Sequence, residues 1–405
     1  MNTHHKKDEL QMDENIKIMQ RLKRDPMRFD VLDLFDSIGR SKKFVLGKSE
    51  DNASFVQLIS ESLAGANTDS MIYGRRTEAM FSYVAASLGK CLLIKKEDAG
   101  DVISSSLDII IPDYRVVLED GSQLLVEVKN YRQQSAYDDY IIKTEYLDRI
   151  IRYSQIIDSE LFFAVYWSLW DMWTLVSVND FQRSDNTAIL PFHTAIKRNY
   201  MGRLGDVHIG TTPPLSIRIY TNKGKPHSVN HEGVAEFVIE SVEIRCKQSV
   251  ITLDNERRIA MAIMMYGNWA ETSRAYYSDE HLREIDYIEF SYSPEECNEE
   301  QGFSFVDSIS TIISRQYSQL TAPNGKVERL TPNIAPGMLG FIVPEAYKSD
   351  VLPLWRIHQQ PYLSRALYLT PAPFAEKSAN GAFVLSVHST IVQPLCTIGL
   401  DKQRR

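Results

Sequence analysis

The sequence has few cysteines and no long apolar run. Its 405 residues contain 4 cysteines, Cys91, Cys246, Cys297 and Cys396, which lie far apart and form no CxxC pair. A disulfide framework and a zinc ribbon are therefore not expected. No apolar stretch is long enough to span a bilayer, and the N-terminus lacks the apolar core of a signal peptide. These absences predict a cytoplasmic protein that does not act on a membrane.

Positive charge is also scarce. The net charge is −8, and residues 71–185 hold twelve Lys or Arg against eighteen Asp or Glu. Because phosphate binding depends on local positive charge, we expect modest, salt-sensitive affinity for a bare nucleic-acid duplex. The acidity favours an activity that depends on a partner, an assembly or a recognition domain. The composition, 43% hydrophobic and 24% charged, is that of an ordinary globular chain with room for two or three cores.

A β-hairpin is predicted over residues 112–129, PDYRVVLEDGSQLLVEVK. A two-residue loop at Asp120 and Gly121 would mix polar and apolar side chains on each face of the hairpin. A three-residue loop, with Gly121 in the left-handed conformation, pairs Asp113 with Glu127 and separates the two kinds of side chain. We therefore predict the three-residue loop.

In this register one face of the hairpin is apolar, and the other carries Asp113, Glu127 and Lys129. Two carboxylates this close repel each other unless a cation lies between them, and a hard divalent cation has the matching preference for oxygen ligands. Lys129 would add positive charge beside a water bound to that cation. These groups meet the needs of metal-assisted phosphodiester hydrolysis. The alternative is a solvated ladder of charged side chains on a sheet face.

The spacing of these residues resembles the PD-(D/E)xK nuclease superfamily, which has the restriction-endonuclease-like fold. Pro112 and Asp113 are followed, after thirteen residues, by Glu127, Val128 and Lys129. The resemblance implies that Asp113 and Glu127 are metal-binding acids, that Lys129 is the catalytic lysine, and that the backbone carbonyl of Val128 is a metal ligand. It also implies Mg²⁺ or Mn²⁺ as the cofactor.

The superfamily, including its Holliday-junction-resolvase-like members, often places a further Glu on a helix before the first strand. Residues 76–88 predict that helix, and Glu78 lies at the edge of its apolar stripe. The resemblance makes Glu78 a third metal ligand; the alternative is an acid that complements the helix dipole. The remaining core elements are expected as a strand at 91–95, a helix at 140–157 and strands at 161–167 and 173–178.

Two further positions bear on the resemblance. Asp108 is the rival for the first acid, but it lies beyond the partner strand in the preferred register, so we favour Asp113. Some members carry Gln-x-x-x-Tyr on the second helix, where this chain has Arg149 and Tyr153. That departure argues against the exonuclease-helicase branch, although an arginine there could contact a phosphate.

The predicted fold class is α/β, with three domains. A helical N-terminal extension covers residues 1–70, and its basic cluster of Arg21, Lys23, Arg24 and Arg28 either touches a phosphate backbone or forms a solvated face. The nuclease core, a mixed central sheet flanked by helices, covers 71–185. A separate α+β C-terminal domain covers 186–405, with an interior helix at 258–266 and an amphipathic helix at 305–320. Its role could be recognition, sensing or dimerisation.

Two functions remain open from the sequence. The first is a metal-dependent DNA endonuclease in a bacterial restriction or anti-phage defence system, with transposon-end cutting or junction resolution as other settings. Double-stranded DNA is preferred over single strands and RNA as the partner. A homodimer would supply the two sites needed to cut both strands, and a partner-protein assembly is the other possibility. The second is a catalytically inactive nuclease fold that serves as a nucleic-acid-binding or assembly module.

Overall fold

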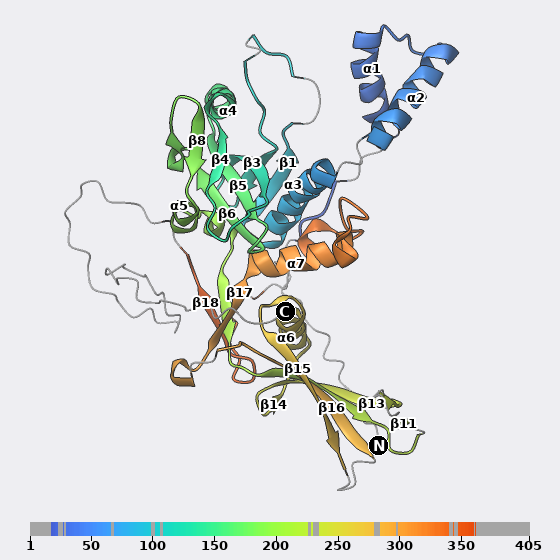
Figure 1. The fold of residues 1–405 in the computed structure, drawn as a ribbon, viewed down its shortest axis with the longest axis vertical. Helices are drawn as coiled ribbons and strands as arrows, with labels where there is room; N and C mark the ends of the chain where they lie inside the picture. Colours follow the sequence, from blue (N-terminus) through green and yellow to red (C-terminus); the bar gives the residue numbers. More distant parts are fainter. Residues whose placement is uncertain are drawn as a thin grey trace, which may run out of the picture. The chain divides into compact units, whose positions relative to one another are not determined.

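The computed structural model describes residues 18–22, 27, 30–65, 69–98, 102–105, 108–225, 228–229, 235–278, 284–296, 299–339, 343, 347–359 and 361. They form a mixed α/β structure (Figure 1), and all of them belong to the first of the chain's two units, Met1–Ser364. The boundaries predicted after residues 70 and 185 remain predictions. Among the described helices, none has the length and apolar character needed to cross a membrane.

The predicted core elements follow one another in the expected order, with one additional strand, β4. They are α3 (Asp69–Ser87), β1 (Cys91–Lys96), β2 (Tyr114–Leu118), β3 (Gln123–Tyr131), β4 (Tyr140–Lys143), α4 (Thr144–Ile157), β5 (Glu160–Trp167) and β6 (Met172–Ser177).

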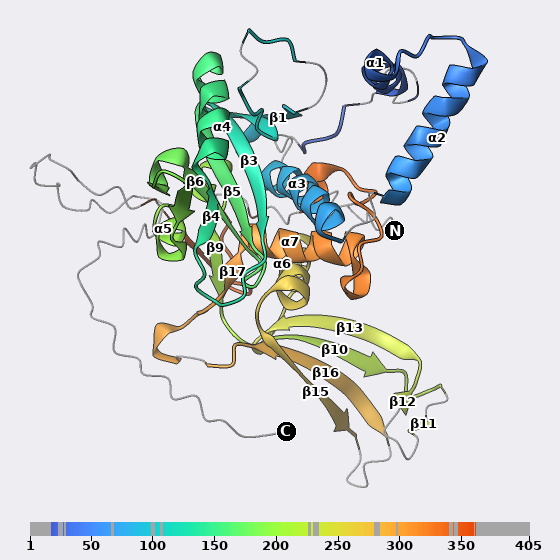
Figure 2. The same ribbon diagram turned by 45° about the horizontal axis from the view of Figure 1, so that its top comes forward.

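Five of these strands form a mixed sheet in the order β1-β2-β3-β5-β6. Only β3 and β5 run parallel, which requires a crossover between them, and α4 lies in that crossover. The helices α3 and α4 cover opposite faces of the sheet (Figure 2). The predicted mixed central sheet flanked by helices is therefore confirmed.

The hairpin has the predicted register. Tyr114 pairs with Val126, and the Leu118 N–H donates to the Ser122 carbonyl at 2.9 Å. The three-residue loop closes through the Gly121 N–H, which donates to the Leu118 carbonyl at 3.0 Å, and Gly121 has a φ of +82°. This register sets Asp113 opposite Glu127.

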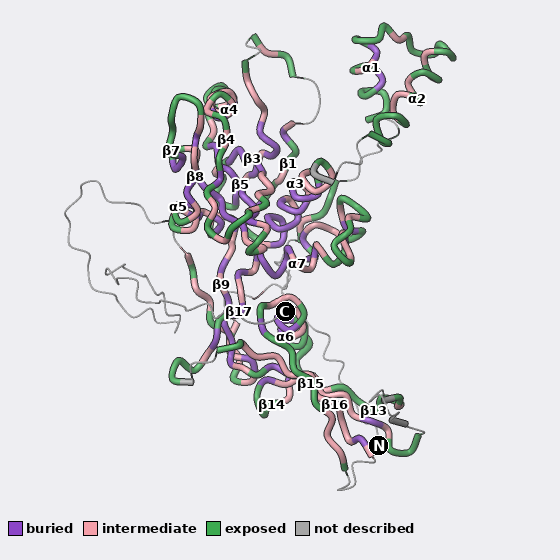
Figure 3. The backbone as a smooth tube through the Cα atoms, in the orientation of Figure 1, coloured by how far each residue is buried: buried purple, intermediate pink, exposed green. Residues whose placement is uncertain are grey.

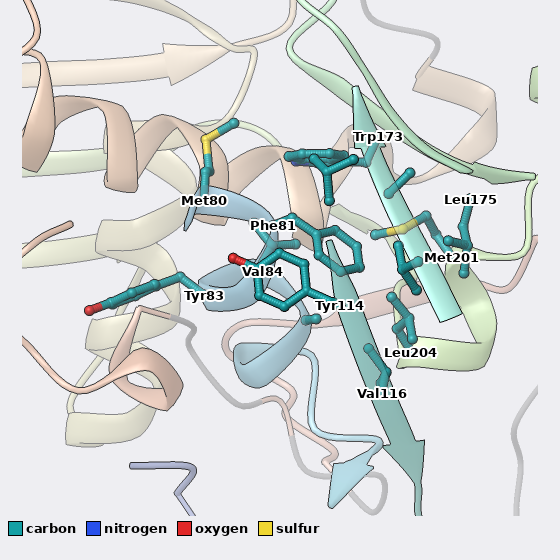
Figure 4. Packing of buried hydrophobic residues seen from close by; sticks show 14 of the residues in the cluster. Met80, Phe81, Tyr83, Val84, Tyr114, Val116, Trp173, Leu175, Met201 and Leu204 are labelled. Atoms are coloured by element: carbon teal, nitrogen blue, oxygen red, sulfur yellow. The ribbon is translucent and has the colours of Figure 1, made fainter. Parts of the chain in front are cut away.

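Each face of the sheet has its own core. The face toward α3 buries the predicted apolar side of the hairpin together with Phe81 and Trp173 of the neighbouring elements (Figure 4). The ring centroids of Phe81 and Trp173 lie 5.7 Å apart. The face toward α4 buries Leu125, Phe163 and Leu147. Burial on both faces explains why β5 is apolar along almost its whole length.

The helix predicted at 140–157 begins later than expected. Residues 140–143 form β4, which pairs with β8 (Thr187–Leu190), and β8 also pairs with β7 (Gln182–Arg183). Tyr140, Ile141 and Ile142 all favour strands. Because β8 offers a partner strand, these residues form a strand although their apolar spacing also suits a helix. The partner lies beyond the boundary predicted after residue 185.

The N-terminal part contains two helices, α1 (Asp30–Lys42) and α2 (Ser49–Gly65). Phe35 of α1 contacts Phe55 of α2, with ring centroids 5.1 Å apart. Within the predicted basic cluster, Lys23, Arg24 and Arg28 lie outside the described residues.

The C-terminal half has helices α5, α6 and α7, a five-stranded sheet, β14-β13-β10-β16-β15, a three-stranded sheet, β17-β9-β18, and a strand pair, β11-β12. Their bounds are α5 (Phe192–Lys197), β9 (His208–Thr211), β10 (Leu215–Thr221), β11 (Ser228–Val229), β12 (Ala235–Glu236), β13 (Ile239–Cys246), β14 (Ser249–Val250), α6 (Asp254–Tyr266), β15 (Ala270–Tyr277), β16 (Ile285–Ser293), β17 (Ser304–Ser308), α7 (Ile309–Thr321) and β18 (Leu354–Ile357). The short 3₁₀ turns of this half are η2 (Met201–Leu204), η3 (Glu299–Gln301), η4 (Pro323–Gly325) and η5 (Pro336–Met338), and a further one, η1 (Val178–Asp180), lies between β6 and β7.

Two helix predictions in this half need correction. The helix predicted from residue 305 begins at Ile309, because the Ser308 side chain caps it by accepting from the Thr311 N–H. Phe305 instead lies in β17. The helix predicted to be interior, α6, buries only one side, since Met265 on its other side is exposed.

The core under α3 continues into α7. Ile313 and Tyr317 of α7 are buried in the same cluster as Phe81, and the Trp173 indole N–H donates to the Ser314 hydroxyl at 2.9 Å. Arg76 of α3 is buried and donates to side chains of α7. Figure 3 shows buried residues along both helices.

Candidate active site

Asp113 and Glu127 form a buried acid pair. Asp113 immediately precedes β2, and Glu127 lies opposite it on β3. Their exposed fractions are 8% and 5%. The Asp113 Oδ2 accepts a hydrogen bond from the Val128 N–H at 2.7 Å, which fixes the carboxyl group against β3.

The environment of Asp113 disfavours its charged form. Burial is the main cause, and the charges of Glu127 and then Glu78 add to it, so that the pKa of Asp113 rises to about 8. The Val128 hydrogen bond and the charge of Lys129 oppose the rise without cancelling it. At neutral pH the isolated pair therefore holds a proton unless a cation offsets the charge.

Lys129 lies beside the acid pair. Its Nζ donates to Glu127 Oε1 at 2.6 Å and to the Tyr146 hydroxyl at 2.9 Å. Burial, the largest single cause, lowers the pKa of Lys129, but the charge and hydrogen bond of Glu127 together with Tyr140 and Asp113 outweigh it, so that the pKa is raised. The side chain therefore remains a cation at neutral pH.

Tyr146 is a site residue that the sequence analysis missed. It lies in the first turns of α4, and its hydroxyl donates to Glu127 Oε1 at 2.5 Å while accepting from Lys129. Burial and the charge of Glu127 raise the pKa of Tyr146, which keeps its proton available for donation. Its position one turn before the buried Ile150 places it on the side of α4 that faces the sheet, which is the signal in the sequence that pointed to it.

Glu78 lies near the acid pair: its charge helps to raise the pKa of Asp113, and its side chain lines the cavity beside Lys129. Its carboxylate accepts from Arg75 Nη1 at 2.8 Å, and Lys96 Nζ lies 4.0 Å away. The Glu78 backbone carbonyl accepts from the Tyr114 hydroxyl at 3.0 Å, which holds this turn of α3 against the start of β2.

A cavity of about 330 Å³ opens beside these residues. It brings together three of the five predicted site residues with residues from α3 and from the end of β3. Its lining consists of Gly74, Glu78, Val128, Lys129, Asn130 and Arg132. Asp113 and Glu127 adjoin the lining through their hydrogen bonds to Val128 and Lys129.

The donor set of the acid pair fits a hard divalent cation. Carboxylate oxygens are its preferred ligands, and its charge would offset the repulsion that raises the pKa of Asp113. Within the described ranges no group of three or more His, Cys, Asp or Glu has a metal-holding arrangement, and Glu78 is paired with Arg75. The structure thus brings two of the three predicted acids into direct juxtaposition.

Asp108, the rival acid, lies elsewhere. Its carboxylate forms ion pairs with Arg149 and Arg152 of α4, the former at 3.0 Å. Tyr153 donates to Glu97 at 2.7 Å, and Arg115 pairs with the same carboxylate. Arg149, which the sequence analysis considered for a phosphate contact, is therefore paired with Asp108.

No protein-family model and no curated protein sequence matches the chain. Among solved structures, the chain is similar to a Holliday junction resolvase from Archaeoglobus fulgidus, with 15% sequence identity and a TM-score of 0.20. The match covers 24% of this chain and 73% of the resolvase chain. A likeness this weak supports neither a mechanism nor a substrate for this chain.

Proposed function

We propose that the chain is a divalent-metal-dependent endonuclease that hydrolyses phosphodiester bonds in DNA. The convergence of Asp113, Glu127 and Lys129 at the edge of the cavity supports the proposal most strongly. A buried acid pair that retains a proton and adjoins a lysine is costly for stability, and such perturbed groups gather at functional sites.

In this proposal Asp113, Glu127 and the Val128 carbonyl would hold Mg²⁺ or Mn²⁺. The Glu78 carboxylate would also attract this cation, since its charge acts on Asp113. The cation, when bound, supplies Lewis-acid polarisation and a more acidic water. Lys129 remains protonated, so it donates a hydrogen bond and stabilises the negative charge that develops on the phosphoryl oxygens. Tyr146 keeps Lys129 and Glu127 in place through its two hydrogen bonds.

The test is cleavage of supercoiled plasmid and of single-stranded DNA with magnesium, manganese or EDTA. Wild-type protein should nick DNA only with the metal, and Lys129→Ala should lower the rate by about 100-fold or more. Lys143→Ala is the matched control, because Lys143 is an exposed lysine on β4, the next strand along the chain, which belongs to another sheet. Equal rates for wild type and Lys129→Ala would contradict the assigned role.

The competing function is a catalytically inactive nuclease fold that binds nucleic acid or supports an assembly. The presence of both acids and the lysine, with Lys129 bonded to Glu127 and Asp113 bonded to the neighbouring Val128 N–H, argues against it. DNA binding by the folded wild-type protein, with no cleavage under any metal condition, would favour this function. We also propose a role in defence against phage, on the expectation that the enzyme depends on a partner. Protection from phage in cells that express wild type, and its loss in cells that express Lys129→Ala, would support this role.

A further inference from the structure

Arg132 is a cavity residue that the proposed chemistry does not use. It follows the end of β3 and lines the cavity together with Lys129. Its guanidinium carbon lies 4.3 Å from the centroid of the Tyr73 ring, a distance at which a cation and an aromatic face attract each other. The contact holds a long side chain in one place at the cavity edge.

Both the side chain and the backbone of Tyr73 form hydrogen bonds. Its hydroxyl donates to the backbone carbonyl of Gly325 in η4, and its own carbonyl accepts from the Thr77 hydroxyl at 2.9 Å. The ring that supports Arg132 is thus fixed between α3 and a segment that follows α7. Such support lowers the entropy that Arg132 would lose on binding a ligand.

The charges around the cavity distinguish Arg132 from its neighbours. Lys129 is bound to Glu127, and Arg75 is bound to Glu78. In the part of the chain that the structure describes, Arg132 makes no ion pair. Its guanidinium donors are therefore not engaged by a carboxylate, although the Glu78 carboxylate shares the cavity.

We infer that Arg132 binds a backbone phosphate of the nucleic acid, and that this phosphate neighbours the phosphate at which the strand is cut. This inference rests on the proposed function. A guanidinium offers two parallel N–H groups that match two phosphate oxygens, whereas the lysine in the same cavity is held by Glu127. The cavity, at about 330 Å³, has room for a group of nucleotide size. Arg132 is a binding residue, and its contact positions the strand relative to the acid pair.

The experiment measures the affinity of the full chain for a labelled DNA duplex with calcium, at several salt concentrations between about 50 and 200 mM. Arg132→Ala should weaken binding by about 10-fold or more and lower the salt slope by about one. Tyr73→Leu, which removes the ring, should bind more weakly than wild type, and Tyr73→Phe, which keeps the ring but loses the bond to Gly325, should lie between the two. Arg274→Ala is the matched control, because Arg274 also stacks on a tyrosine, Tyr276 at 5.1 Å, but lies on β15.

The outcomes separate the two proposals. A wild-type protein that neither binds nor cleaves DNA would contradict the proposed function itself. A wild-type protein that cleaves, with Arg132→Ala matching it in affinity and salt slope, would overturn this inference alone. Equal losses of affinity in Arg132→Ala and Arg274→Ala would also overturn it, since that result denies a specific backbone contact at the cavity.

Discussion

Asp113 is held where its charged form is unfavourable. Burial and the charge of Glu127 raise its pKa to about 8. A carboxyl group with a raised pKa binds its proton more tightly in the folded than in the unfolded chain. Its favourable contribution to stability is complete below the unfolded pKa of about 3.9 and is lost as the pH rises toward the folded pKa.

Asp113→Asn should therefore stabilise the metal-free protein at alkaline pH. Asparagine keeps an oxygen for the Val128 N–H but carries no charge beside Glu127. We expect the free energy of unfolding to rise by about 2 to 4 kcal/mol near pH 9 and to change little near pH 4. Urea denaturation in EDTA at the two pH values measures this. Asp120→Asn, in the exposed hairpin turn, is the control and should show no such gain.

Tyr146→Phe tests how much the hydroxyl of α4 contributes. The variant keeps the ring, whose centroid lies 4.7 Å from Lys129 Nζ, but loses the hydrogen bonds to Glu127 and Lys129. We expect kcat to fall by about 10-fold with little change in KM, because Lys129 is less well oriented. Steady-state cleavage kinetics measure both constants. A rise in KM at unchanged kcat would assign Tyr146 to substrate binding instead.

Among the site residues, the sequence predicted those whose positions depend on the pairing of two strands within one hairpin. Asp113, Glu127 and Lys129 share one hairpin, so its register decides where they lie. Tyr146 comes from a helix that reaches the site through the β3-α4-β5 crossover. Its contact with Lys129 depends on how α4 packs on the sheet, which periodicity alone does not give.

The hairpin is the element that creates the acid pair, and its turn depends on Gly121. With φ at +82° and no heavy atom within 4 Å of an added Cβ, alanine there would suffer backbone strain alone. Gly121→Ala should lower the free energy of unfolding by about 1 kcal/mol while the folded enzyme keeps its activity. Gly65→Ala is the control, since its Cβ also meets open space but its φ is not positive. A loss of activity greater than the loss of folded protein would mean that the turn also controls the register of the site.

Elements differ in how far the sequence determined them. The hairpin was predictable because an Asp-Gly turn and two alternating strands agree on one register. Strand β4 was not, because residues 140–143 become a strand only through β8, more than forty positions later. In the same way, Ser308 ends β17 and caps α7, a local signal that the apolar spacing from Phe305 obscured.

In the whole molecule, the sheet that carries the site depends on the C-terminal half. Ile313 and Tyr317 of α7 complete the core under α3, and Arg76 donates to Thr321 at 2.8 Å and to Ser318 at 2.8 Å. Tyr73 of α3 also bonds to η4. The strand that bears Glu127 and the helix that bears Glu78 therefore rest on contacts from both halves.

A chain that ends at residue 185 should consequently fail to form the site. It would lose α7 and β8, exposing apolar surface under α3 and leaving β4 without its partner. We expect the fragment to bind a hydrophobic dye and to unfold without a cooperative thermal transition. A chain that ends at residue 364 is the control and should unfold cooperatively. A cooperative, dye-negative fragment that ends at 185 would show instead that the core is an independent domain.

The central claim is that Asp113 and Glu127 hold a divalent cation. Calorimetric titration of manganese near pH 7, in two buffers of different ionisation enthalpy, tests it most directly. Because the pKa of Asp113 is raised to about 8, the metal-free pair holds a proton, and binding should release about one proton per cation. The account predicts this release in wild type and weakened binding in Glu127→Gln. No binding by folded wild-type protein, or equal binding by Glu127→Gln, would contradict it.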